Sequence, residues 1–143
     1  MTNMQAALSV TQLERIEQIV EKKKWIGQTY NYLLQDLDMI NLSVKLTNYC
    51  ENIYWVYAIT LKDNFSKTAE QVMLELREFK IGTRSFFYPM HQQPVFNQAG
   101  LFLQDKLPNS EKLYRTGFYI PSGLALTQDQ AIEVSKALHE VLL

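Results

Sequence analysis

Apolar side chains recur at helical spacing along the first part of the chain. They fall three and four residues apart, with glutamates and lysines between them, as in a helix that buries one face against a sheet. The stripe consists of Leu13, Ile16 and Val20. Thr2 and Asn3 are favourable N-cap residues, and no proline follows before Leu34. Gly27 is a candidate for a bend near Trp25, but Tyr30, Leu33 and Leu34 continue the pattern, which predicts one long helix from Asn3 to Leu34.

Three later stretches have the composition of strands. Ile53–Leu61 is dense in β-branched and aromatic residues and nearly continuous in apolarity, which predicts a central strand covered on both faces. A short strand is expected near Leu42–Leu46. Phe118–Pro121 is a brief apolar run whose proline predicts a sheet edge or the point where the chain leaves the sheet.

Helices are expected between and after these strands. Thr68 with Gln71 and Thr127 with Gln130 both have the spacing of a capping box, in front of apolar stripes. Asn109 is expected to cap a short helix between them. Short strands that alternate with one-sided helices predict an α+β fold, with a small antiparallel or mixed sheet of about three strands backed by helices. We expect one domain over residues 1–143.

The stretch Gly82–Phe96 predicts a short strand that runs into a rigid loop. Its prolines restrict the backbone and leave Arg84, Tyr88 and His91 as polar tips on an apolar segment, a pattern typical of a ligand-facing edge. The alternative is that the polar residues are ordinary and the segment packs inward. In that case the core contains Phe86, Phe87 and Phe96.

Composition excludes several classes of function. The 143 residues carry 14 basic and 15 acidic side chains, a net charge of −1, so no basic surface for nucleic acid is indicated. The lysine run Lys22–Lys24 is expected on a solvated helix face. The single Cys50 excludes an intramolecular disulfide and has no neighbours for a zinc site, which indicates a reduced, cytoplasmic compartment. No stretch predicts a membrane span or a targeting signal.

Motifs for catalysis are missing from the chain. The five glycines are too far apart for a phosphate-binding loop, and His91 and His139 have no partner at metal-ligand spacing. The lysines fall on polar helix faces or in turns, where none is desolvated enough to form a Schiff base. We therefore assign no catalytic residue and no metal ligand.

Three segments resemble a known family in order and spacing. They are Met1–Leu8, Gly82–Pro94 and Gly117–Gly123, joined by Tyr54–Tyr57, and together they span nearly the whole chain. They are similar to the C-terminal part of the DegT/DnrJ/StrS aminotransferases, and most of all to the perosamine-forming type. These enzymes use pyridoxal phosphate to aminate nucleotide-linked keto-sugars.

The resemblance implies that the active site of the family's enzymes is shared between two domains. In the family, a large domain upstream supplies the Schiff-base lysine and most of the cofactor's phosphate site, and this chain has neither. Asn3 matches a family asparagine that reaches the cofactor phosphate of the neighbouring subunit. Arg84, Tyr88 and His91 fall in the loop that lines the sugar-nucleotide side of the pocket. Pyridoxal phosphate is thus expected in the intact enzyme and not on this chain alone.

Two hypotheses of different class follow. The first is part of a sugar aminotransferase, which binds its nucleotide-sugar substrate only with a large domain from the same or a complementing chain. The second is a non-catalytic module that forms a homo-oligomer or binds a partner through a surface that the large domain covers in relatives. The expected interface with the partner is formed by apolar residues of the first helix, Met4, Leu8 and Val10.

Overall fold

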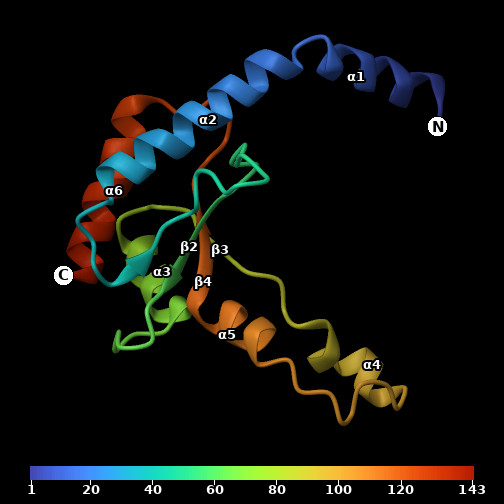
Figure 1. Cartoon of the computed structure of the whole chain (residues 1–143), viewed down its shortest axis with the longest axis vertical. Helices are drawn as coiled ribbons and strands as arrows, with labels where there is room; N and C mark the ends of the chain where they lie inside the picture. The colour runs from blue at the N-terminus through green and yellow to red at the C-terminus, as the bar shows by residue number, and fades with distance from the viewer.

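A four-stranded antiparallel sheet lies at the centre of the computed structural model, which describes residues 1–143 (Figure 1). The predicted α+β class is confirmed, with four strands in place of about three. In chain order the elements are α1 (Asn3–Leu13), α2 (Ile16–Leu33), β1 (Ile40–Asn41), β2 (Tyr57–Leu61), α3 (Ala69–Glu78), β3 (Arg84–Ser85), the 3₁₀ turn η1 (Met90–Gln92), α4 (Pro94–Gln98), α5 (Pro108–Thr116), β4 (Gly117–Ile120) and α6 (Gln128–Leu142).

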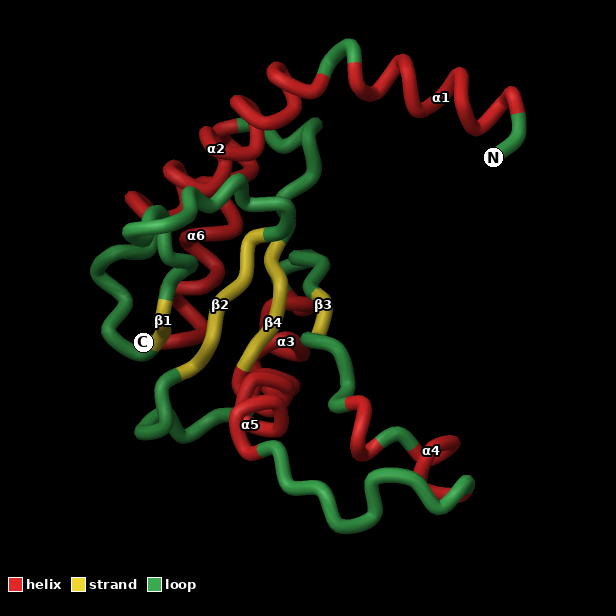
Figure 2. Tube along the Cα trace, turned by 45° about the vertical axis from the view of Figure 1, so that its right-hand side comes forward, coloured by secondary structure: helices red, strands yellow, loops and turns green.

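The sheet has the order β1-β2-β4-β3 and is covered by helices on one face only. Tyr57, Ile59 and Leu61 are buried, and the residues between them in β2 are half-buried, so the strand alternates as a one-sided strand does. The prediction that this strand is covered on both faces is therefore wrong. Figure 2 shows α3 and α6 behind the strands, and α2 packs against α6.

The other face carries a row of residues across three strands. Ala58 of β2 pairs with Tyr119 of β4, which pairs with Arg84 of β3, and residues opposite each other share a face. Ala58 and Tyr119 are half-buried and Arg84 is exposed. We call this surface the open face. β4 lies inside the sheet, and the chain leaves the sheet at Pro121.

The predicted long N-terminal helix is two helices, which is a correction. α1 ends at Leu13 and α2 begins at Ile16, and the amide of Arg15 bonds back only three residues, to the carbonyl of Gln12 (3.2 Å). No residue of α1 is buried, whereas α2 buries residues against the sheet. Because helices in proteins depend on packing of an apolar face, nothing holds α1 in line with α2.

The predicted strands in the region before α3 are shorter than expected. β2 begins at Tyr57 and not at residue 53, because Tyr54 has a φ of 52°, a left-handed conformation that stops an extended strand. The strand expected near Leu42–Leu46 is also wrong. Only an isolated bridge joins Leu46 to Glu51, while β1 lies earlier in the chain.

The turn at Tyr54 directs its ring onto α2, where Gly27 receives it. A Cβ at Gly27 would lie 2.2 Å from Cγ of Tyr54, so only glycine fits. Gly27 lies inside α2, which is continuous from Ile16 to Leu33. Tyr54 stacks on Tyr57 with ring centroids 6.0 Å apart, and the amide of Asn31 bridges both hydroxyls.

Tyr30 completes this tyrosine cluster. Its ring centroid lies 4.9 Å from that of Tyr57, and its hydroxyl donates to the carbonyl of Pro121 at 2.8 Å. Burial raises the pKa values of Tyr30 and Tyr57, so both hydroxyls stay protonated as donors. We define the tyrosine cluster as Tyr30, Tyr54 and Tyr57; it ties α2 to both central strands.

The helices predicted from capping boxes are confirmed. Thr68 with Gln71 opens α3 and Thr127 with Gln130 opens α6, each with both reciprocal hydrogen bonds. Asn109 does not cap α5, because Pro108 occupies the first helical position and the N-cap is Leu107. None of the helices is both long enough and apolar enough to cross a lipid bilayer.

Gly27→Ala tests the contact between α2 and the Tyr54 ring. The added methyl group must displace a buried ring, so we expect a loss of about 2 kcal/mol or more in the free energy of unfolding. Gly82→Ala is the matched control, since nothing lies within 4 Å of its Cβ position, and it should change stability by less than about 0.5 kcal/mol. Equal urea midpoints for both variants would contradict the contact.

Candidate functional site

Two segments project from the body of the molecule, and the open face lies on the side between them. α1 extends from one end of the body, and the segment of residues 86–107 extends from the other (Figures 1 and 2). We call residues 86–107 the arm; it contains η1 and α4. The arm bears exposed apolar side chains, namely Phe87, Met90, Val95, Leu101, Phe102, Leu103 and Leu107.

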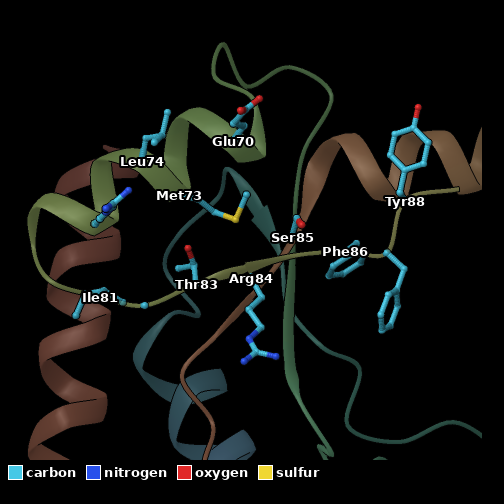
Figure 3. A pocket seen from close by; sticks show the side chains of 12 residues that line it. Glu70, Met73, Leu74, Ile81, Thr83, Arg84, Ser85, Phe86 and Tyr88 are labelled. Carbon is cyan, nitrogen blue, oxygen red and sulfur yellow. The ribbon is translucent and has the colours of Figure 1, made fainter. Parts of the chain in front are cut away.

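Arg84 is exposed on the open face at the start of the arm. It belongs to β3 and lies opposite Tyr119. In Figure 3 its side chain extends away from α3, whereas the neighbouring Thr83 points toward that helix, as alternation along a strand requires. Arg84 forms no salt bridge, so its guanidinium is available to an external anion.

The three phenylalanines do not form one core cluster. Phe86 is half-buried and stacks on Tyr119, with ring centroids 4.7 Å apart. Phe87 is 82% exposed, so its assignment to the core is wrong. The cause is again alternation, which places Phe86 on the sheet and turns Phe87 outward. Phe96 is half-buried in the arm, edge-on to Phe102.

Tyr88 attaches the arm to the body through α5. Its ring meets that of Tyr114 edge-on, with centroids 5.0 Å apart, and the side chain remains partly exposed. This contact leaves the hydroxyl pointing away from the strand (Figure 3). Tyr88 thus combines a packed ring with a free polar end.

His91 is buried, which corrects its description as an exposed polar tip. It is 6% exposed, and its Nε2 lies 2.9 Å from Oε1 of Glu111 in α5. The hydrogen bond from His91 lowers the pKa of the Glu111 carboxyl below its ordinary value. Nδ1 of His91 is also buried and has no partner within the chain. His91 therefore holds the base of the arm against α5.

The four candidate residues do not converge within this chain. Arg84 lies on the open face, while Tyr88 and His91 pack against α5. Asn3 is the first residue of α1 and is exposed, at the end of the molecule far from the arm (Figure 1).

Lys23 is a residue of this region that the sequence did not single out. Its Nζ donates to the carbonyls of Trp55 (2.9 Å) and Ser122 (2.6 Å), so its expected place on a solvated face is wrong. Burial lowers its pKa. Nothing in the lysine run distinguishes Lys23 from its neighbours, because the distinction comes from a turn and a strand end far along the chain.

The match to a known protein family covers nearly the whole chain. The model of the DegT/DnrJ/EryC1/StrS aminotransferase family matches residues 1–139. The chain belongs to this family.

Two curated relatives of the chain are named GDP-perosamine synthases. A GDP-perosamine synthase of Vibrio cholerae is 32% identical over 138 residues, which are 96% of this chain and 36% of that enzyme. A GDP-perosamine synthase of Caulobacter vibrioides is 30% identical over 144 residues, 99% of this chain and 38% of the enzyme. The chain thus spans little more than a third of the length of these relatives, and it corresponds to part of an aminotransferase.

Solved structures show the same fold. Helicobacter pylori PseC, an aminotransferase involved in pseudoaminic acid biosynthesis, superposes with a TM-score of 0.86 at 18% identity, over 96% of this chain and 36% of that one. DesV of S. venezuelae, solved with a ketimine intermediate, gives a TM-score of 0.82 at 22% identity, over 96% of this chain and 35% of DesV. The arrangement of α2, the sheet and α6 is therefore a known part of such enzymes.

A Schiff base with pyridoxal phosphate needs a desolvated lysine amine. Lys23 is the lysine whose pKa burial lowers, and its Nζ donates to two carbonyls, those of Trp55 and Ser122. No group of three or more potential metal ligands occurs.

His91→Ala and Phe87→Ala separate packing from exposure in the arm. Removing the buried, hydrogen-bonded imidazole should cost about 1–3 kcal/mol of unfolding free energy, whereas truncating the exposed Phe87 should cost less than about 0.5 kcal/mol. Arg84→Ala, on the open face, is expected to behave like Phe87→Ala. Urea denaturation measures all three, and a larger loss for Phe87→Ala than for His91→Ala would refute the placement of the arm.

Proposed function

We propose that this chain is the C-terminal portion of a pyridoxal phosphate-dependent aminotransferase that acts on a nucleotide-linked keto-sugar of the perosamine type. It is one wall of a composite active site and is inactive alone. The family match and the names of its relatives support this assignment. EpsN of Bacillus subtilis, 29% identical over 140 residues, is named a putative pyridoxal phosphate-dependent aminotransferase.

The observation that carries the proposal is the uncovered side of the fold. α1 has eleven residues, none of them buried and none of them charged. A helix exposed on all sides normally has charged residues to keep it in water. Apolar side chains on α1 are instead largely exposed, among them Met4 (77%), Leu8 (63%) and Leu13 (66%). Such a surface is expected to be covered by another polypeptide.

The candidate residues take complementary roles in this arrangement. Asn3, at the start of α1, reaches the cofactor phosphate of a neighbouring subunit. Arg84 and the free hydroxyl of Tyr88 contact the nucleotide-sugar. His91 is a positioning residue, because its contact with Glu111 holds the arm at the rim of the site. The covering polypeptide is the large domain, in a homo-oligomer or on a complementing chain, and it supplies the Schiff-base lysine.

Reconstitution tests the proposal directly. The chain is mixed with the portion of the V. cholerae synthase that lies outside the matched region, and GDP-perosamine formation is measured. We expect turnover from the mixture and none from either part. The synthase's own matched segment, added as a separate polypeptide, is the positive control. Leu8→Glu in the chain should reduce turnover at least several-fold, because it places a charge in the covered surface.

One result would contradict the proposal. The mixture could form a stable complex by size-exclusion chromatography, match the positive control in pyridoxal phosphate content, and still produce no GDP-perosamine. The chain would then have the fold of the family without its activity.

A non-catalytic module is the second candidate, and the exposed α1 favours it as well. In this case the uncharged helix binds a second copy of the chain or another partner. Self-association by light scattering that Leu8→Glu abolishes, together with an inactive mixture, would select this function over the first.

A further inference from the structure

β3 is an edge strand whose outer side has no partner within the chain. The sheet order is β1-β2-β4-β3, so β3 pairs only with β4. The amide of Phe86 donates to the carbonyl of Gly117 (3.4 Å), and bonded positions alternate along an antiparallel pair. The N–H and C=O of the preceding residue, Ser85, therefore point away from β4. Thr83 and Phe87 share this direction, and neither forms a backbone hydrogen bond within the chain.

One face of α3 borders this open edge. It consists of residues at helical positions i, i+3, i+4 and i+7, which line a groove of about 780 Å³ between α3 and β3. They are Glu70, Met73, Leu74 and Arg77. We call these four residues the α3 face. Its centre is apolar, since Met73 is half-buried and Leu74 is 56% exposed.

The two ends of the α3 face carry opposite charges. Glu70 and Arg77 are both exposed and lie about 10 Å apart along the helix axis. Neither forms a salt bridge within the chain. In Figure 3, α3 runs from Glu70 to Leu74 in the direction opposite to that of the segment from Ile81 to Phe86. The acidic end of the face therefore lies toward the arm, and the basic end lies toward the start of β3.

From this edge we infer that a second copy of the chain pairs with β3, in the antiparallel direction and around a twofold axis at Ser85. Each Ser85 N–H then donates to the C=O of the partner's Ser85, and Thr83 lies opposite the partner's Phe87. The two four-stranded sheets become one continuous sheet. An edge strand is covered in this way by the backbone of an identical strand.

Charge complementarity selects a second copy of the chain as the partner. A twofold axis at Ser85 brings the basic end of one α3 face to the acidic end of the other. Arg77 therefore faces the partner's Glu70, and the same pair occurs twice in the interface. The Leu74 side chains lie between the two pairs, near the axis. A partner of uniform charge would match only one end of the face.

This interface goes beyond the proposed function. It uses neither α1, which the large domain covers in that proposal, nor the open face. Self-association through β3 and self-association through α1 can therefore be separated by mutation.

Analytical ultracentrifugation of the full chain tests the pairing. All variants carry Leu8→Glu, so that α1 does not contribute, and we expect this parent to dimerise. Glu70→Arg and Arg77→Glu should each raise the dimer dissociation constant at least tenfold, because like charges then face each other at two places. An equimolar mixture of the two variants should regain the affinity of the parent, since both pairs in the mixed dimer are again attractive.

Two matched controls accompany the charge reversals. Glu78→Arg changes a charge of α3 outside the groove and should leave the dissociation constant unchanged. Ser85→Pro removes the N–H that points away from β4 and should prevent dimerisation, whereas Ser85→Ala keeps that N–H and should not. A monomeric parent, equal effects of Glu78→Arg and Glu70→Arg, or a mixture that associates no more tightly than its components would each overturn the inference.

Discussion

The contact between Tyr54 and Gly27 is the constraint on which the rest of the structure depends. The ring occupies the space that a side chain on α2 would fill, and the tyrosine cluster then joins α2 to β2 and to the end of β4. The contact of the Tyr54 ring with Gly27 fixes the position of α2 relative to the ends of β2 and β4. Lys23, one turn earlier in the helix, thereby reaches the carbonyls of Trp55 and Ser122. In the same turn, Tyr54 is buried and Trp55 is exposed.

A sheet anchored in this way on one face leaves the other face for function. The helices bury the alternating apolar residues of β2, and the row formed by Ala58, Tyr119 and Arg84 remains open between α1 and the arm. Neither projection carries a buried core of its own, so both depend on what they contact. An active site built from two polypeptide segments needs an uncovered surface on each of them. The catalytic groups of one segment can then reach a substrate that is bound by the other.

Local chemistry explains which parts could be predicted from the sequence. Capping boxes and apolar stripes indicate α3 and α6, and composition indicates Phe118–Pro121, because these signals act over a few residues. The prolines and polar residues of Gly82–Phe96 indicated the stretch around Arg84, and the family resemblance supplied its role. The Tyr54 turn and the burial of His91 depend on contacts between distant segments, and the break after Leu13 goes with the absence of such contacts on α1. No local pattern encodes either. Periodicity extended α1 into α2 because it cannot show whether a face is covered.

Hydrogen–deuterium exchange along the chain tests most directly whether the uncovered side is an interface with the rest of an aminotransferase. In the chain alone, the amides of α1 should exchange rapidly while those of α6 are protected, since α1 has no buried residue. Addition of the synthase portion that lies outside the matched region should protect α1 and β3 and leave α6 unchanged. Protection of α1 in the monomeric chain alone, or an active mixture in which α1 and β3 exchange as before, would contradict the account.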